Sequence, residues 1–219
     1  MLFYYNENAL AVTESQIGHA SHDAAQLVEG FLQSEAFATL PPEVQEQAPE
    51  VIVDFARLAF IYHHDHPPNW SEESLTDVLV YLLPGKVVAD EGYFQAAVPA
   101  LSAFFDWLYV QGMLPNAEHL QRTLAQQQLD YETHVADPQC WSMSKHIYLM
   151  TLEQGLDMED EAQTDMAGQA FTHQLQAQFN KLEAALKEAD SRGEFDRMLE
   201  RFLKINRDEL PNLEEEAAG

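Results

Sequence analysis

Three histidines and one aspartate occupy positions 63 to 66, at the end of an apolar run and directly before a double proline. Imidazole and carboxylate groups are suitable ligands for zinc, nickel or iron. Neighbouring side chains on a helix diverge by about 100°, so at most two of these four residues can face one ion. The missing ligands would have to come from another segment of the chain.

A second pair of histidines supplies such a segment. His19 and His22 lie three positions apart and therefore share one face of a predicted helix. Together with His64 and Asp65 they form a candidate site for a divalent transition metal. The structural interpretation is that the histidines 63 to 66 meet unpaired carbonyl groups at a helix C-terminus. In that case they lie at a partly exposed corner, hold no tightly bound metal, and no cofactor is needed.

The same residues also match the order of a metal-dependent HD-type phosphohydrolase. Its pattern is an upstream histidine, a His-Asp doublet on a helix and a distant aspartate. These roles correspond to His22, to His64 with Asp65, and to Asp130 or Asp137. A phosphate-ester substrate calls for basic residues nearby, and only Arg57 is close in sequence. A hydrolase that uses the His63–His66 region is therefore the alternative to a non-enzymatic function.

Other catalytic signatures are missing from the sequence. Cys140 is the only cysteine, which rules out an intramolecular disulfide and a cysteine-rich zinc site. Because Trp141 and Met143 indicate apolar surroundings, and His146 is too far along the predicted helix to meet the thiol, we predict a buried structural cysteine. The chain has no phosphate-binding glycine loop, dinucleotide turn, nucleophile elbow or HExxH motif. These absences favour a non-enzymatic protein.

The chain is strongly acidic. Its 37 acidic residues against 11 Lys and Arg give a formal net charge of -26 at pH 7. Such a surface repels phosphate backbones and anionic lipid, so we expect no direct binding of nucleic acid or membranes. We expect basic proteins or cations as partners. The chain shows neither a secretory signal nor an apolar run of about 20 residues, so we expect a soluble, cytoplasmic protein.

Helical periodicity runs through the whole chain and predicts an all-α protein, a multi-helix bundle of about eight helices. A capping box at Thr13 predicts the start of the first helix. Another helix is expected to begin near Pro49 and to end at the histidines. Pro84 and Gly85 are expected to end a third helix, and Pro99 to kink or restart the next.

We predict one helical core domain over residues 1–156, with a C-terminal helical hairpin over 157–206 packed on it and an acidic tail over 207–219. After the double proline, Trp70 is expected to pack back on the core. Seven apolar side chains fall on mutually consistent faces of three successive helices and are expected to form that core. They are Phe55, Leu58, Leu79, Leu82, Leu101, Phe105 and Leu108.

Part of the chain, from about residue 49 to 124, also resembles a known helical region. The similarity lies in Trp70-Ser-Glu-Glu-Ser-Leu75, Leu82-Leu-Pro-Gly-Lys86, Val98-Pro-Ala-Leu101, Phe104-Phe-Asp-Trp107-Leu108 and Gly112. These stretches resemble the helical region that accompanies plasmid pRiA4b ORF-3-like and SEC-C-containing bacterial proteins. The resemblance implies a helical fold and no activity. SEC-C modules bind zinc through clustered cysteines, and this chain, with one cysteine, lacks that module.

The sequence therefore favours a non-enzymatic, acidic helical protein that acts through protein contacts, as an adaptor or accessory factor. This interpretation rests on the absence of catalytic motifs, on the helical patterning and on the acidic surface.

Overall fold

The computed structural model describes residues 13–67, 69–153, 155 and 205. Every element in this described part is helical and none is a strand, which confirms the all-α prediction. The chain divides into two compact units, Asn6–Gln139 and the pair of segments Met1–Tyr5 and Cys140–Gly219. Apart from Ile205, the predicted hairpin over 157–206 and the tail over 207–219 lie outside the described residues, and the predicted total of eight helices depends on them.

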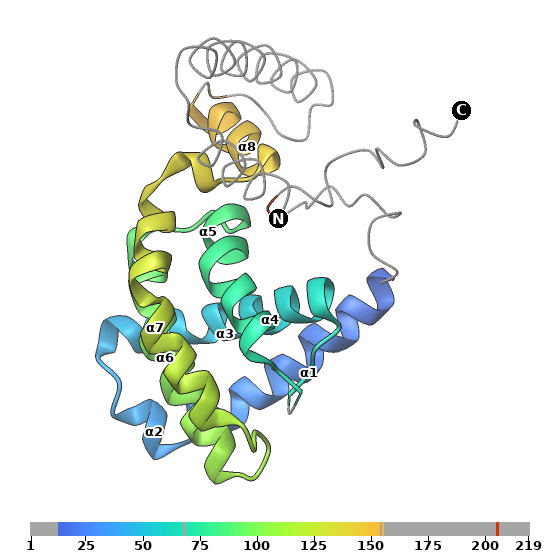
Figure 1. The fold of residues 1–219 in the computed structure, drawn as a ribbon, viewed down its shortest axis with the longest axis vertical. Helices are drawn as coiled ribbons and strands as arrows, with labels where there is room; N and C mark the ends of the chain where they lie inside the picture. Colours follow the sequence, from blue (N-terminus) through green and yellow to red (C-terminus); the bar gives the residue numbers. More distant parts are fainter. Residues whose placement is uncertain (1–12, 68, 154, 156–204, 206–219) are drawn as a thin grey trace, which may run out of the picture. The chain divides into compact units, whose positions relative to one another are not determined.

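The unit Asn6–Gln139 is built from short and long helices in close succession (Figure 1). Helix α3 packs against both α1 and α6, and α7 packs against α6 and the segment from α4 to α5. The elements are α1 (Glu14–Leu32), α2 (Glu35–Ala38), α3 (Pro42–His63), α4 (Glu72–Thr76), the π-helix η1 (Asp77–Leu82), α5 (Leu83–Lys86), α6 (Glu91–Val110) and α7 (Ala117–Ala136). The 3-10 turn η2 (Pro138–Cys140) follows, and α8 (Met143–Glu153) belongs to the other unit. No helix in the described ranges has the length and apolar character of a membrane span.

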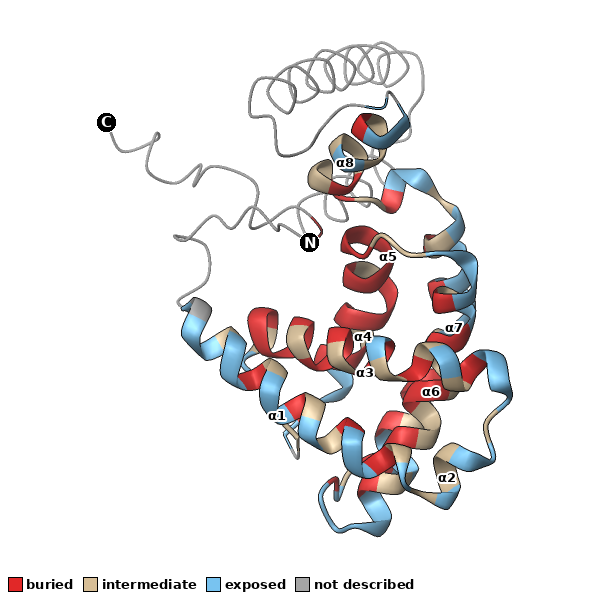
Figure 2. Cartoon of the chain, turned by 180° about the vertical axis from the view of Figure 1, so that it is seen from behind, coloured by how far each residue is buried: buried red, intermediate tan, exposed pale blue. Residues whose placement is uncertain are grey.

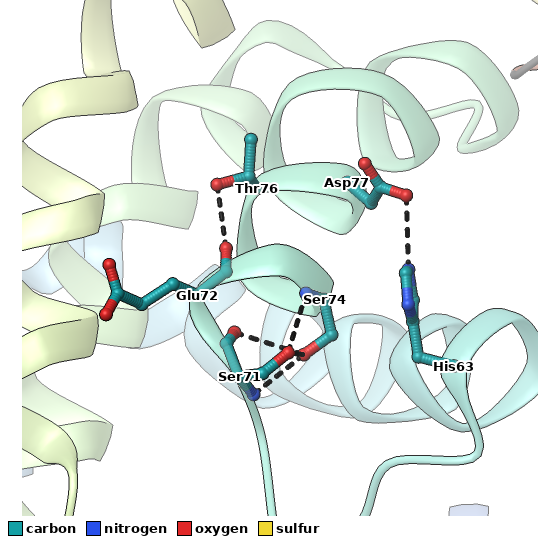
Figure 3. Close-up of polar contacts among 6 residues, drawn as sticks. All are labelled: His63, Ser71, Glu72, Ser74, Thr76 and Asp77. Carbon is teal, nitrogen blue, oxygen red and sulfur yellow. Dashed lines mark hydrogen bonds and ion pairs between the residues drawn. The ribbon is translucent and has the colours of Figure 1, made fainter.

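Helix starts are set by local side-chain hydrogen bonds. The Gln16 N–H donates to Thr13 Oγ1 at 3.3 Å and the Thr13 N–H donates to Gln16 Oε1 at 2.9 Å, which confirms the predicted capping box. At α4 the N–H groups of Ser71 and Ser74 each donate to the other residue's hydroxyl at 3.0 Å (Figure 3). These bonds satisfy amide groups that have no partner within the helix.

The prediction that a helix begins near Pro49 is wrong. Helix α3 begins at Pro42, and Pro49 lies inside it rather than at its start. Pro42 already occupies the first turn, where a missing N–H costs nothing, and burial of the following apolar face carries the helix through Pro49. Helix α6 continues through Pro99, so of the two predicted outcomes, a kink or a new helix, the new helix is excluded.

The segment from α4 to α5 is continuous and ends at Lys86, one residue after Gly85, so the prediction that Pro84 and Gly85 end this helix is confirmed to within one residue. Pro84 has no N–H for the Val80 carbonyl four residues earlier, and its ring would collide with that carbonyl in a regular α-helix. The π-helix η1, whose turns are wider than those of an α-helix, ends two residues before this proline and includes Val80. His134 Nδ1 of α7 lies 2.8 Å from the Val80 oxygen. Because a carbonyl only accepts, Nδ1 carries the proton and donates this hydrogen bond.

The predicted core is confirmed. Each of its seven side chains is at most 3% exposed, and buried residues concentrate in α3, α5 and α6 (Figure 2). The predicted packing of Trp70 is confirmed as well, since it is 1% exposed and its ring centroid lies 5.0 Å from Phe55 and 5.8 Å from Phe105. Cys140 of the other unit is 1% exposed, as predicted for a structural thiol.

A buried carboxylate, which the sequence did not reveal, joins α3 to α6. Asp54 is 8% exposed and accepts a hydrogen bond from Arg57 Nη2 at 2.7 Å through Oδ1. The Tyr93 hydroxyl donates to Asp54 Oδ2 at 2.9 Å. Burial, with the adjacent Asp54 carboxylate, raises the pKa of Tyr93 far above its ordinary value. Tyr93 therefore keeps its proton and remains the donor.

Candidate functional site

The histidine cluster lies at the C-terminus of α3, which ends at His63, as predicted. His64 adopts the left-handed conformation, with φ 56° and ψ 24°, and is exposed. The N–H of His64 donates to Phe60 O at 2.9 Å and that of Asp65 to Ala59 O at 3.3 Å. This turn satisfies the last carbonyl groups of the helix and redirects the chain.

The His63 side chain contacts η1, whereas His64 and His66 both lie near Phe60, with the His64 and Phe60 ring centroids 6.3 Å apart. His63 Nε2 lies 3.3 Å from Asp77 Oδ2 on η1 (Figure 3), and these side chains are 15% and 9% exposed. The angle does not satisfy a hydrogen bond, so the contact acts as an ion pair when His63 is protonated. His66 lies against Phe60, with ring centroids 4.6 Å apart. Position 63 therefore faces the protein, 64 faces solvent and 66 covers an aromatic ring.

The other members of the candidate metal site lie on α1. His19 and His22 are both exposed, and His22 Nε2 is 3.1 Å from Gln26 Nε2. Within the described residues, no group of three or more His, Cys, Asp or Glu side chains is placed to hold a metal ion. A metal at His19, His22, His64 and Asp65 stays a prediction.

The aspartates of the HD-type alternative lie on α7 and just after it. Asp130 is exposed, and Asp137 Oδ1 accepts a hydrogen bond from the Gln139 N–H at 3.0 Å. Arg57, the basic residue closest in sequence to the His-Asp doublet, pairs with Asp54. The phosphohydrolase also stays a prediction.

A surface groove of about 740 Å³ lies elsewhere in the unit Asn6–Gln139. Its walls come from the end of α1 and the following turn, from α2, and from the end of α6, and we call it the α1–α2–α6 groove. The lining residues with the clearest chemical roles are Gly30, Glu35, Asp106, Trp107 and Val110.

Trp107 is held firmly in the wall of the groove. Its ring stacks on Phe104 with centroids 5.8 Å apart and an interplanar angle of 18°, and Phe31 lies 5.8 Å away. A Cβ atom at Gly30 would come within 3.2 Å of two carbon atoms of the indole. Gly30 thus permits the close approach of Trp107 to α1. A glycine inside a predicted helix, where it costs about 1 kcal/mol relative to alanine, was the one sequence signal for this contact.

The groove carries negative charge. Glu35 and Asp106 line it, and none of its described lining residues is a lysine, arginine or histidine. Asp106 Oδ1 accepts a hydrogen bond from Gln121 Nε2 at 2.9 Å, which orients the carboxylate. The basic residues between positions 13 and 139 are Arg57, Lys86 and Arg122. Arg57 pairs with a carboxylate, Lys86 is buried, and Arg122 is exposed on α7 and does not line the groove, so the only charged side chains in the described groove lining are Glu35 and Asp106.

Apolar side chains are exposed at and just after the end of α6, and one of them, Val110, lines the groove. Tyr109 is 60% exposed, Val110 is 78% exposed and Met113 is 41% exposed. Gly112, with φ 73°, ends this helical segment. Large apolar side chains gathered on a surface mark interaction sites more often than isolated ones do.

A separate feature of the other unit is the buried amine of Lys145 on α8. The residue is 6% exposed and its Nζ lies 4.9 Å from the centroid of the Trp141 ring. Burial lowers the pKa of Lys145 to about 8.

We expect Lys145 to titrate with a midpoint near pH 8 in the folded chain. NMR of the 13C-dimethylated lysines measures this, and the same signal in urea should move to about 10.4. Because the unfolded chain then binds more protons between these two values, Lys145 makes stability rise with pH across this window. A folded midpoint above pH 10 would contradict the expectation.

Comparison with known proteins gives no match: no family model, no curated protein and no solved structure is similar to this chain. The resemblance of residues 49–124 to the helical region of pRiA4b ORF-3-like and SEC-C-containing proteins therefore stays a prediction. A functional proposal has to be built on the geometry of the described residues.

Proposed function

We propose that this chain is a non-enzymatic protein-interaction protein, and that the α1–α2–α6 groove is where it docks a basic partner protein. The observation that carries the proposal is the groove itself, with Glu35, Asp106 and the exposed Val110 in its walls.

The groove combines the two features that a docking surface needs. Val110 offers apolar area in the groove, and its removal from water stabilises a complex. The carboxylates orient a basic partner, and the net charge of -26 attracts it over a longer range. We expect the rate of association to fall as salt concentration rises.

The hydrolase alternative has weaker support. His63 faces Asp77 rather than a groove, and His64 points into solvent from a left-handed turn. Arg57, the nearest basic residue in sequence, is engaged by Asp54. The histidine corner therefore offers less to a substrate than the α1–α2–α6 groove offers to a protein.

Capture from native lysate with matched variants tests the proposal. Val110→Ser removes an apolar side chain at the groove, and Leu129→Ser removes one that is 73% exposed on α7, outside it. We expect the parent and Leu129→Ser to retain the same partner protein and Val110→Ser to lose most of it. Capture that is identical for all three proteins would exclude the groove as the docking surface.

A further inference from the structure

We infer that the α1–α2–α6 groove selects an arginine side chain on a segment of the partner protein, with its guanidinium against Trp107 and paired with Asp106. This inference rests on the proposed function and names the chemistry that the groove recognises. The supporting observation is that the Trp107 indole and the Asp106 carboxylate, which Gln121 orients, both lie on α6 and both line the groove.

The indole favours a planar cation. Trp107 and Asp106 are neighbours on α6 and both line the groove. Phe104 stacks on one side of the Trp107 ring and Gly30 lies against its edge, so the ring keeps its position without a ligand. Tryptophan is the best aromatic partner for a cation, and the flat guanidinium of arginine stacks on it more readily than the compact ammonium of lysine.

The carboxylates of Asp106 and Glu35 can pair with the guanidinium group. Gln121 Nε2 occupies only Oδ1 of Asp106, and Oδ2 has no hydrogen-bond partner among the described residues. Glu35 adds a second carboxylate from the α2 wall of the groove. A guanidinium has five N–H donors, so it can donate to a carboxylate while its face rests on a ring.

The occupant is a protein segment rather than a nucleic acid or a lipid. Acidic walls repel phosphate groups, which excludes both of those classes on charge. Val110, which lines the groove and is 78% exposed, provides a contact for an apolar residue near the arginine. The partner segment therefore carries an arginine with an apolar side chain close to it.

The test uses the full 15N-labelled chain and three acetylated peptide amides that differ at one position. Each peptide has seven residues, all alanine except for one leucine and one variable residue. The variable residue is arginine, lysine or citrulline, which is the neutral counterpart of arginine. We expect the arginine peptide to shift the Trp107 indole signal and the Gly30 amide signal to saturation. The lysine peptide should bind at least about threefold more weakly, and the citrulline peptide should not saturate.

Two variants that each remove one negative charge test whether the arginine contacts Asp106. Asp106→Asn removes the charge but keeps an oxygen that accepts from Gln121, and it should weaken the arginine peptide about threefold. Glu118→Gln, on the exposed surface of α7, should leave the affinity within about twofold.

The outcomes separate the two proposals. Equal binding of the arginine and lysine peptides, or equal binding to the parent and Asp106→Asn, would overturn arginine selection. So would shifts that miss Trp107 and Gly30. If these failures occur while Val110→Ser still loses its partner, docking at the groove stands and only the arginine inference is overturned.

Discussion

Replacing Phe105 with alanine is expected to lower the free energy of unfolding by about 3 to 5 kcal/mol. The Phe105 side chain is fully buried, with ring centroids 5.7 Å from Phe55 and 5.8 Å from Trp70. Its removal leaves a cavity between α3, α6 and Trp70. Since a domain of this size is stable by about 5 to 15 kcal/mol, much of the folded margin is lost.

Urea denaturation followed by far-UV circular dichroism measures this effect. Leu129→Ala is the matched control, because Leu129 is 73% exposed and its truncation should change stability by less than about 0.5 kcal/mol. If Phe105→Ala unfolds at the same urea concentration as the parent, the aromatic cluster around Phe105 does not hold this unit together.

Replacing Asp54 with alanine is expected to destabilise the fold by about 3 kcal/mol. The change removes the carboxylate that both Arg57 and Tyr93 bind, and it leaves the Tyr93 hydroxyl, in a residue 1% exposed, without that acceptor. Tyr93→Phe, which removes the donor instead, should cost about 1 kcal/mol.

A double-mutant cycle tests this explanation. Asp54→Ala together with Tyr93→Phe should cost less than the sum of the single changes, because no buried hydroxyl is then left unsatisfied. Asp130→Ala, which removes an exposed carboxylate on α7, controls for the loss of charge alone. Strictly additive single changes would mean that the Asp54–Tyr93 hydrogen bond contributes little.

Both proposals concern the α1–α2–α6 groove, whereas the stability predictions concern the core. The groove experiments change exposed side chains, such as Val110, and should leave the urea transition in place. The core variants should shift that transition instead. A groove variant that unfolds early would point to a stability effect, and its loss of partner would then not count as evidence for docking.

Features with a short-range cause were predictable from the sequence. The capping box at Thr13 uses atoms three residues apart, and the buried stripe that includes Phe55 and Leu101 follows from helical periodicity. The burial of Trp70 was also predictable, because the double proline limits where the chain can turn. The helix end at the histidines was predictable, because a residue before proline is driven out of the helical region, but the left-handed turn at His64 was not predicted.

Only the tertiary structure decided the features that join distant segments. The helix around Pro84 contains the π-helix η1. His134 contacts the Val80 carbonyl in that π-helix, 54 residues away in sequence. Asp54 and Tyr93 are 39 residues apart, and nothing in their local sequence predicts their hydrogen bond.

The α1–α2–α6 groove also depends on contacts between distant segments. Gly30 and Trp107 lie on α1 and α6, and their contact requires both helices to be in place. Composition and periodicity therefore determined a helical, acidic chain and its buried stripe, because these follow from local geometry and from summed charge. Which side chains meet across helices depends on how the helices pack, and packing energies are set by contacts that no single segment contains.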